Sequence, residues 1–269
     1  MKKTVLFSGV LLLAFTVSGA ETVLYRMDAD KNAKKFDGGG TIYNKEAKSG
    51  QNCYIVRGRN RLMSMNKIKI QPDKKYRASF YVKAVGESPA QIFGGWICYD
   101  KKGKVIPSEA FHSVRNSLTE VTASAAKGDK IIKIKDGSKW KKGKVYQIAF
   151  NAKKDDSDLP NYTVYGFEKV EQKDGVWQIT LQKPLAFDVA GGTFVREHVK
   201  GGDFLFASNK VITPGEWQKI ESIWYPGKYI RMASAVRLVL ISNLDGKYKN
   251  SQILIDDLEM KMQGTNVEF

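Results

Sequence analysis

The carboxylates and histidines of this 269-residue chain are the first residues to weigh for catalysis. Acidic side chains are densest at Asp155-Asp156-Ser157-Asp158 and at Asp256-Asp257, and two histidines are present, His112 and His198. A glycosidase needs two carboxylates about 5–10 Å apart across a groove. One acidic run is expected in a loop and the other in the closing strand, so neither suggests such a pair. No Gly-x-Ser-x-Gly motif supplies a serine nucleophile. We therefore expect no enzymatic activity.

The two cysteines, Cys53 and Cys98, both lie in strand-like segments. In an oxidising compartment such a pair can form a disulfide, but two buried free thiols would give the same pattern. The sequence leaves both interpretations open. Neither cysteine has the further soft ligands nearby that a zinc site needs.

Aromatic side chains are the strongest candidates for ligand binding. A sugar ring packs the C–H groups of its face on an aromatic plane, while polar side chains at the rim bind its hydroxyls. Trp217 is expected in the core because Ile220 and Ile223 follow it. The predicted contact residues are five other aromatics and three polar partners: Trp96, Tyr99, Trp224, Tyr225, Tyr229, His112, Arg115 and Arg231.

The N-terminus has the layout of a secretory signal peptide. Lys2 and Lys3 precede an apolar run from Val5 to Val17, and the small residues Ser18-Gly19-Ala20 follow it. This run is shorter than the roughly 20 residues that span a bilayer. We predict that residues 1–20 are removed, and that the mature chain is secreted, periplasmic or at the cell surface, without stable membrane insertion.

The chain is strongly basic, with a formal net charge of +16 at pH 7. Residues 118–197 hold 14 Lys and Arg against 11 Asp and Glu, whereas the rest of the mature chain holds 28 against 17. A basic surface favours anionic partners such as nucleic acid, anionic lipid or acidic polysaccharide. Export argues against nucleic acid.

Alternating residues predict an all-β fold. Residues 76–83 alternate apolar and polar side chains, which is typical of a half-buried antiparallel strand. Residues 91–100 form the next expected strand, which ends in the turn Asp100-Lys101-Lys102-Gly103-Lys104. Two more strands are expected at 235–241 and 252–260. Regular strands joined by regular turns predict a β-sandwich.

Residues 118–197 have their own set of short strands and turns, expected at 130–135, 145–150, 166–170 and 177–181. We predict that this segment is a small β-barrel inserted at an exposed loop of the sandwich. The predicted organisation is a signal peptide at 1–20, a discontinuous sandwich at 21–117 and 198–262, the insert at 118–197, and a tail at 263–269.

Residues 72–84, 215–220 and 253–260 carry a family resemblance. They resemble the jelly-roll carbohydrate-binding modules, of the family 4, 9 and 22 type, that are attached to bacterial polysaccharide-degrading enzymes. The likeness extends over the whole predicted sandwich. It implies a jelly-roll β-sandwich that binds polysaccharide, although the same sandwich hosts unrelated functions.

The insert carries a separate, fainter likeness. Residues 122–134 and 179–185 resemble small β modules of phage-tail and surface-associated proteins. The likeness implies a spacer or adhesion element, or a purely structural decoration.

The jelly-roll resemblance also implies a structural calcium, held partly by an Asp of the closing strand. Asp256 shares a strand face with Leu254 and Leu258, and a carboxylate in apolar register must be paired, hydrogen-bonded or metal-bound. Asp28 or Asp30, in the expected first strand, could complete the site. Backbone amides bonded to Asp256 are the alternative.

These observations predict an exported, non-catalytic protein that binds an extended polysaccharide, with an acidic one favoured by the charge. The alternative is a surface adhesion protein that binds other proteins. A remote alternative is a jelly-roll alginate lyase, because Tyr225 to Tyr229 resembles the Tyr-rich strand of those enzymes. This chain has Gln91-Ile92-Phe93 where the lyases have Gln-Ile-His. The sequence identifies neither the ligand nor the oligomeric state.

Overall fold

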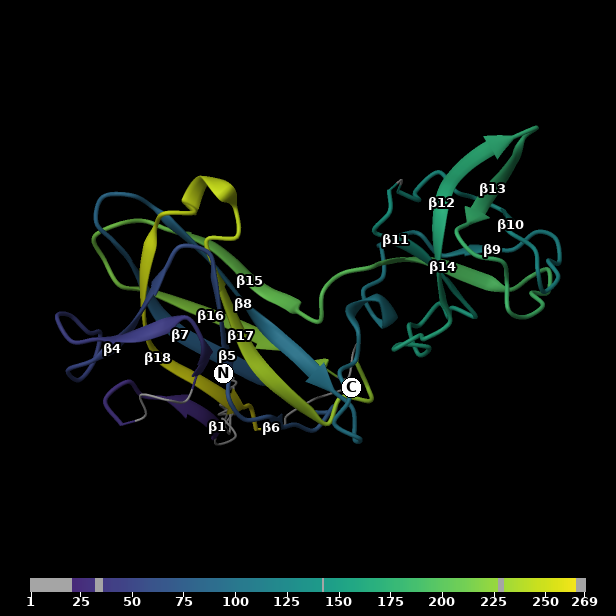
Figure 1. Cartoon of the computed structure of the whole chain (residues 1–269). Coiled ribbons are helices and arrows are strands. Elements are labelled where there is room, and N and C mark those ends of the chain that lie inside the picture. Colours follow the sequence, from purple (N-terminus) through teal and green to yellow (C-terminus); the bar gives the residue numbers. More distant parts are fainter. Residues whose placement is uncertain (1–20, 32–35, 142, 227–229, 265–269) are drawn as a thin grey trace, which may run out of the picture.

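The structure, a computed structural model, describes residues 21–31, 36–141, 143–226 and 230–264. The predicted signal peptide and most of the predicted tail lie outside these ranges. Figure 1 shows two β units, a larger one that contains both ends of the described chain and a smaller one reached through two connecting segments. None of the helices in the described ranges is long and apolar enough to cross a membrane. The predicted all-β class is confirmed.

The larger unit is a sandwich of two antiparallel sheets. In the first sheet the strand order is β16-β7-β18-β4-β3, and β1 also pairs with β18. Residues in β7 alternate between buried and half-buried along its whole length, as the sequence predicted. The strands of this sheet are β1 (Thr22–Met27), β3 (Gly40–Tyr43), β4 (Cys53–Arg57), β7 (Tyr76–Val85), β16 (Gln218–Trp224) and β18 (Gln252–Met262).

The second sheet faces the first and has the order β15-β8-β17-β5-β2, with β6 also paired to β17. Its strands are β2 (Phe36–Gly38), β5 (Asn60–Ser64), β6 (Ile68–Lys69), β8 (Ala90–Tyr99), β15 (Leu205–Ile212) and β17 (Ala235–Ser242). The inward side chains of both sheets form one apolar core that includes Tyr76, Trp96 and Trp224. Burial of this apolar surface is what holds the two sheets together.

The smaller unit, called the insert below, is a separate six-stranded sheet of the order β10-β13-β12-β11-β14-β9. It has its own core, with Phe150, Phe167 and Ile179 fully buried. Asp174 and Gly175 both have positive φ, which suits the tight turn between β12 and β13. The strands are β9 (Thr119–Glu120), β10 (Ile131–Ile134), β11 (Tyr146–Phe150), β12 (Val164–Lys173), β13 (Val176–Leu181) and β14 (Phe194–Val199).

The two edges of the insert sheet also approach each other, because Val121 forms a bridge with Ile134. The Lys135 amide also donates to the Glu120 carbonyl at 2.8 Å. The closed barrel expected for this segment stays a prediction.

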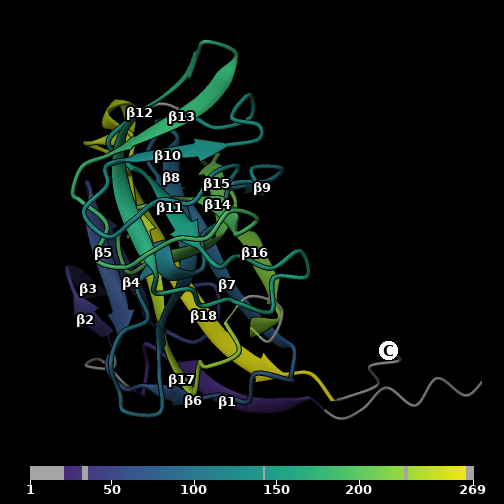
Figure 2. The same ribbon diagram turned by 90° about the vertical axis from the view of Figure 1, so that its right-hand side faces the viewer.

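The insert interrupts the connection between β8 and β15, which are neighbours in the second sheet. Leu205 of β15 lies opposite Trp96 of β8, so the two connecting segments leave the sandwich side by side. The first segment contains the 3-10 helix η1 (Ser108–Ala110) and is bonded to the insert. The Val114 amide donates to the Glu197 carbonyl at 2.8 Å, and the Val199 amide donates to the His112 carbonyl at 2.9 Å. Figure 2 shows the insert in front of the sandwich in the turned view.

Candidate functional site

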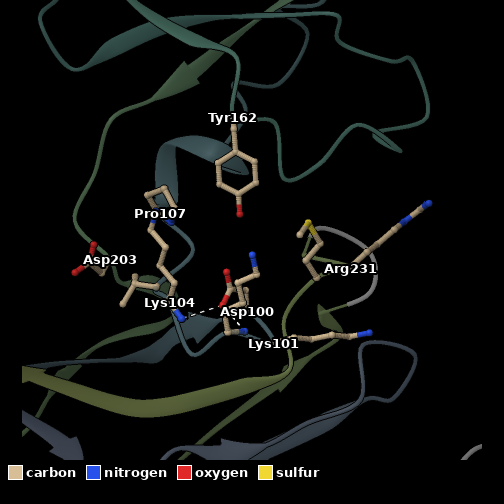
Figure 3. A pocket seen from close by; sticks show the side chains of 10 residues that line it. Asp100, Lys101, Lys104, Pro107, Tyr162, Asp203 and Arg231 are labelled. Carbon is tan, nitrogen blue, oxygen red and sulfur yellow. Dashed lines mark hydrogen bonds between the residues drawn. The ribbon is translucent and has the colours of Figure 1, made fainter.

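A crevice of about 740 Å³ lies where the insert faces one end of the sandwich. The sandwich contributes the turn after β8 and the segment before β17, and the insert contributes Tyr162 from the loop before β12 (Figure 3). The lining residues are Asp100, Lys101, Lys102, Lys104, Val105, Pro107, Tyr162, Asp203, Arg231 and Met232.

The turn after β8 presents most of the crevice's charge. The Asp100 carboxylate accepts hydrogen bonds from the Lys102 and Lys104 amides, both at 2.9 Å. Gly103 has φ +74°, a conformation that side-chain-bearing residues rarely adopt. Because Asp100 closes the turn on its own backbone, the lysine side chains are left exposed to solvent.

The electrostatic balance of the crevice is positive. Lys101, Lys102, Lys104 and Arg231 are all exposed, and none forms a salt bridge with another residue of the described chain. Asp100 and Asp203 are the two carboxylates of the lining, and Asp100 already accepts the two turn amides. Unpaired cations grouped around a concave surface attract anionic ligands.

A second hollow of about 630 Å³ adjoins the crevice and shares Asp100 and Lys101 with it. Lys67 and Lys69 add two more cations there. Lys67 donates to the Gly103 carbonyl at 2.9 Å, and its ammonium lies 4.2 Å from the centre of the Tyr99 ring. The basic surface therefore continues beyond the crevice around the turn.

The crevice also offers apolar contact area. Tyr162 is 54% exposed and Met232 is 51% exposed. In Figure 3 the Tyr162 ring enters from the insert, with its hydroxyl directed toward Asp100. Burial raises the pKa of Tyr162, and the Asp100 carboxylate raises it further. The site combines a ring, a thioether and several cations.

Two of the predicted sugar-stacking residues lie in the core, which corrects the prediction. Trp96 is 0% exposed and Trp224 is 7% exposed, and their rings stack on each other with centres 5.0 Å apart. Both side chains point between the two sheets, so the ring faces are used in packing. The strand period placed these residues on strands, but it did not decide which face of each strand was covered.

One of the predicted contact residues, Arg231, lines the crevice. Tyr99 is buried beneath Lys67, and Tyr225 is half-buried just before residues outside the described chain. Tyr229 itself lies outside the described residues. His112 and Arg115 are exposed on the first connecting segment, but they do not line the crevice.

Asp256 faces away from the sandwich core because it alternates with the inward Ile253 and Ile255, and β18 contains a bulge just after it, between Asp256 and Glu259. Asp257 in this bulge has φ +49°, so the inward residues change from Ile253 and Ile255 to Leu258. The sequence register had placed Asp256 and Leu258 on one face. That placement was wrong, since one extra residue in a strand reverses every later side chain.

Asp256 is nevertheless buried, under the segment that follows β3. Its carboxylate accepts hydrogen bonds from the backbone amides of Lys48 at 2.9 Å, Ser49 at 3.2 Å and Asp257 at 2.8 Å. Burial raises the pKa of Asp256, and the amide bonds oppose this rise. Both carboxylate oxygens thus have backbone partners.

The other two predicted calcium ligands also serve local turns. Asp30 accepts bonds from the Gln51 amide at 3.1 Å and from the Asn52 side chain at 2.8 Å, and the Gln51 bond lowers the pKa of Asp30. Asp28 accepts the Asp30 amide at 3.0 Å. Calcium takes about six to eight oxygen ligands. The described ranges contain no group of three or more His, Cys, Asp or Glu residues arranged to hold a metal. These three residues therefore do not fit a calcium site in this arrangement.

Both cysteines are free and buried, in different layers. Cys98 belongs to the core between the sheets, and Cys53 packs with Ile55 and Leu254 on the outer side of the first sheet. Burial raises the pKa of each thiol to about 12. The sequence was compatible with a disulfide or with two buried free thiols, and the structure shows two free thiols.

Sequence reasoning missed most of the crevice. The sequence predicted a turn at Lys101-Lys102-Gly103-Lys104 and no binding site. The three lysines within four residues are the signal that could have indicated a binding surface. Tyr162 and Met232 gave no such signal. They come near the turn through the tertiary arrangement alone.

Two family 22 carbohydrate-binding modules have solved structures that are similar to this chain. The CBM22-1 xylan-binding domain from Paenibacillus barcinonensis is similar with a TM-score of 0.44 and 10% identity, over 92% of this chain and 98% of that chain. The C-terminal family 22 carbohydrate-binding module from Clostridium thermocellum is similar with a TM-score of 0.43 and 9% identity, over 91% and 96%.

A family 11 carbohydrate-binding module from the same bacterium, in complex with a β-1,3-1,4-mixed-linked tetrasaccharide, is similar with a TM-score of 0.33 and 10% identity, over 94% and 92%. No known protein family matches the sequence, and no curated protein matches it. These three solved structures are carbohydrate-binding modules, at TM-scores and identities too low to assign a ligand.

Proposed function

We propose that this protein is an exported, non-catalytic carbohydrate-binding protein that holds an extended acidic polysaccharide in the crevice between sandwich and insert. The observation that carries the proposal is a group of exposed cations around one hollow, none of which forms a salt bridge with another described residue: Lys101, Lys102, Lys104 and Arg231. Uronic acid and sulfate groups are the anions that such a ligand would present. Lysine and arginine bind both, and arginine forks match the geometry of carboxylate and sulfate oxygens.

The length of the basic surface supports a polymer rather than a small anion. The crevice and the adjoining hollow share Asp100 and Lys101, so the cations of both lie along one path. A chain of acidic sugars could contact several of them at once. Each exposed contact contributes little free energy alone, and several together give a useful affinity.

The absence of catalysis in this proposal is supported by how the crevice carboxylates are used. Asp100 accepts two amides of its own turn, and Asp203 is exposed on the second connecting segment. A general acid in a glycosidase needs a raised pKa in a sheltered position. Neither residue has the surroundings that such a role requires.

The test is affinity electrophoresis of the mature chain in gels that contain polygalacturonate, dextran sulfate or neutral xylan, from about 0.1 M to 1 M salt. The Debye length falls from about 10 Å to about 3 Å over this range, so retention on the acidic polymers should decrease steeply. The triple variant Lys101→Ala, Lys104→Ala, Arg231→Ala should lose most of the retention at low salt.

The matched control removes three exposed lysines of the insert that do not line the crevice, Lys130, Lys133 and Lys183. Both triple variants lose three positive charges, so a general charge effect would weaken them equally. Equal retention of the two variants would contradict binding in the crevice. If the wild type is not retained on any of the polymers, the proposal of glycan binding is wrong, and a surface adhesion protein that binds other proteins becomes the better hypothesis.

A further inference from the structure

The insert presents one aromatic ring to the crevice. Tyr162 is the one aromatic residue among the large hydrophobic side chains that are more than a third exposed in the described chain. Single exposed apolar residues are common on protein surfaces and need no function. What distinguishes Tyr162 is the construction of the loop that carries it.

The loop before β12 is held by hydrogen bonds of the two residues that flank Tyr162. The buried Asn161 side chain donates to the Phe150 carbonyl at 2.8 Å and to Asp158 at 3.0 Å, and it accepts the Thr163 amide at 2.9 Å. The Asn161 amide donates to the Ala110 carbonyl of η1 at 2.6 Å. The backbone on both sides of Tyr162 is therefore held in place.

A buried guanidinium fastens the same loop to β14. The Arg196 side chain is 5% exposed, bonds Asp158 at 2.8 Å and also pairs with Asp156. A buried arginine is tolerated when carboxylates neutralise it. The acidic run that stood out in the sequence thus anchors a loop.

The ring covers the crevice from the side opposite to the lysine turn. Figure 3 places Tyr162 above Asp100 and Lys101, with Arg231 at one side. The cations come from the sandwich and the ring comes from the insert. A ligand in the crevice would therefore contact both units.

We infer that Tyr162 is a sugar-stacking residue that the insert adds to the crevice, so that the polysaccharide is held between the two units. This inference rests on the proposed function and narrows the class of ligand. A pyranose ring has a face of C–H groups that packs on an aromatic plane. Polyphosphate has the charge without such a face, so Tyr162 selects a polymer of sugars among polyanions.

The experiment compares Tyr162→Ala and Tyr162→Phe in the mature chain, on polygalacturonate, dextran sulfate and polyphosphate. Tyr162→Ala should weaken binding to the acidic glycans about tenfold and leave binding to polyphosphate unchanged. Tyr162→Phe keeps the ring and should bind the glycans within about twofold of the wild type. Since Tyr162 is exposed, neither change should alter the fold, and far-UV circular dichroism checks this.

Ile131→Ala is the matched control, because Ile131 is 51% exposed on the insert and does not line the crevice. It should bind all three polymers as the wild type does. Two results would overturn the inference while leaving the proposed function intact: full glycan binding by Tyr162→Ala, or an equal loss on polyphosphate. Failure of the wild type to bind either glycan would overturn the proposed function itself and the inference with it.

Discussion

Arg196 in the insert and Arg231 at the crevice are both arginines, but one is buried and the other is exposed. Arg196 is buried, and Asp156 and Asp158 neutralise it. Arg231 is exposed and has no salt bridge among the described residues. A buried cation without partners would be strongly unfavourable, whereas an exposed one is stabilised by water. The charges of the insert's interior therefore serve its fold, and those of the crevice are available to a ligand.

The largest effect expected from this comparison is on stability. Arg196→Met should lower the free energy of unfolding of the insert by about 3–5 kcal/mol, because it leaves the buried Asp158 without its cation. Arg231→Met should change stability by less than about 0.5 kcal/mol and weaken binding to acidic glycans. Urea denaturation, with hydrogen exchange of the β14 amides, measures both. Similar destabilisation by the two variants would break the comparison.

A second prediction concerns two adjacent buried groups of β14 that titrate in opposite directions. Burial raises the pKa of Glu197 from its ordinary 4.5 to about 7, and burial lowers the pKa of His198 from its ordinary 6.5 to about 4. Because the folded chain binds the Glu197 proton more tightly than the unfolded chain does, Glu197 makes the insert less stable as the pH rises from 4.5 to about 7. Because the unfolded chain binds the His198 proton more tightly, His198 makes the insert less stable as the pH falls from 6.5 to about 4. In the wild type the two slopes nearly cancel.

Single variants should expose each slope. In Glu197→Gln the stability of the insert should rise between about pH 4 and 6.5, by up to about 1.4 kcal/mol per pH unit. In His198→Gln it should fall between about pH 4.5 and 7 with a similar slope. Thermal or urea unfolding across this pH range gives both signs. If either variant shows the same nearly flat dependence of stability on pH as the wild type, the opposite pKa shifts of Glu197 and His198 are contradicted.

A third prediction sharpens the comparison with Asp256, a buried carboxylate that forms no salt bridge within the described residues. Asp256 is satisfied by the amides of Lys48, Ser49 and Asp257, so Asp256→Ala leaves these donors unpaired and should cost about 1–3 kcal/mol. Melting of the wild type in chelator and in excess calcium should coincide. A rise in melting temperature that grows with calcium concentration would show that a calcium site forms after all.

Local sequence pattern was enough to predict the strands and the sandwich. Alternation in β7 and the turn from Asp100 to Lys104 identified their elements because side-chain period and turn geometry are set by neighbouring residues. The excess of positive charge outside the insert was also visible in the composition. The local pattern did not predict correctly which side chains of each strand face the core. A single bulge turned Leu258 into the core and so separated it from Asp256, and packing placed Trp96 and Trp224 in the core.

The composition of the crevice was decided by the tertiary structure. Lys101, Tyr162 and Arg231 are separated by about sixty residues or more along the chain, and they belong to three different segments. They meet because the insert leaves the sandwich between β8 and β15 and is bonded to its first connecting segment. Periodicity describes how a residue relates to its near neighbours in sequence. It carries no information about which loops of two separately packed cores will face each other across a hollow.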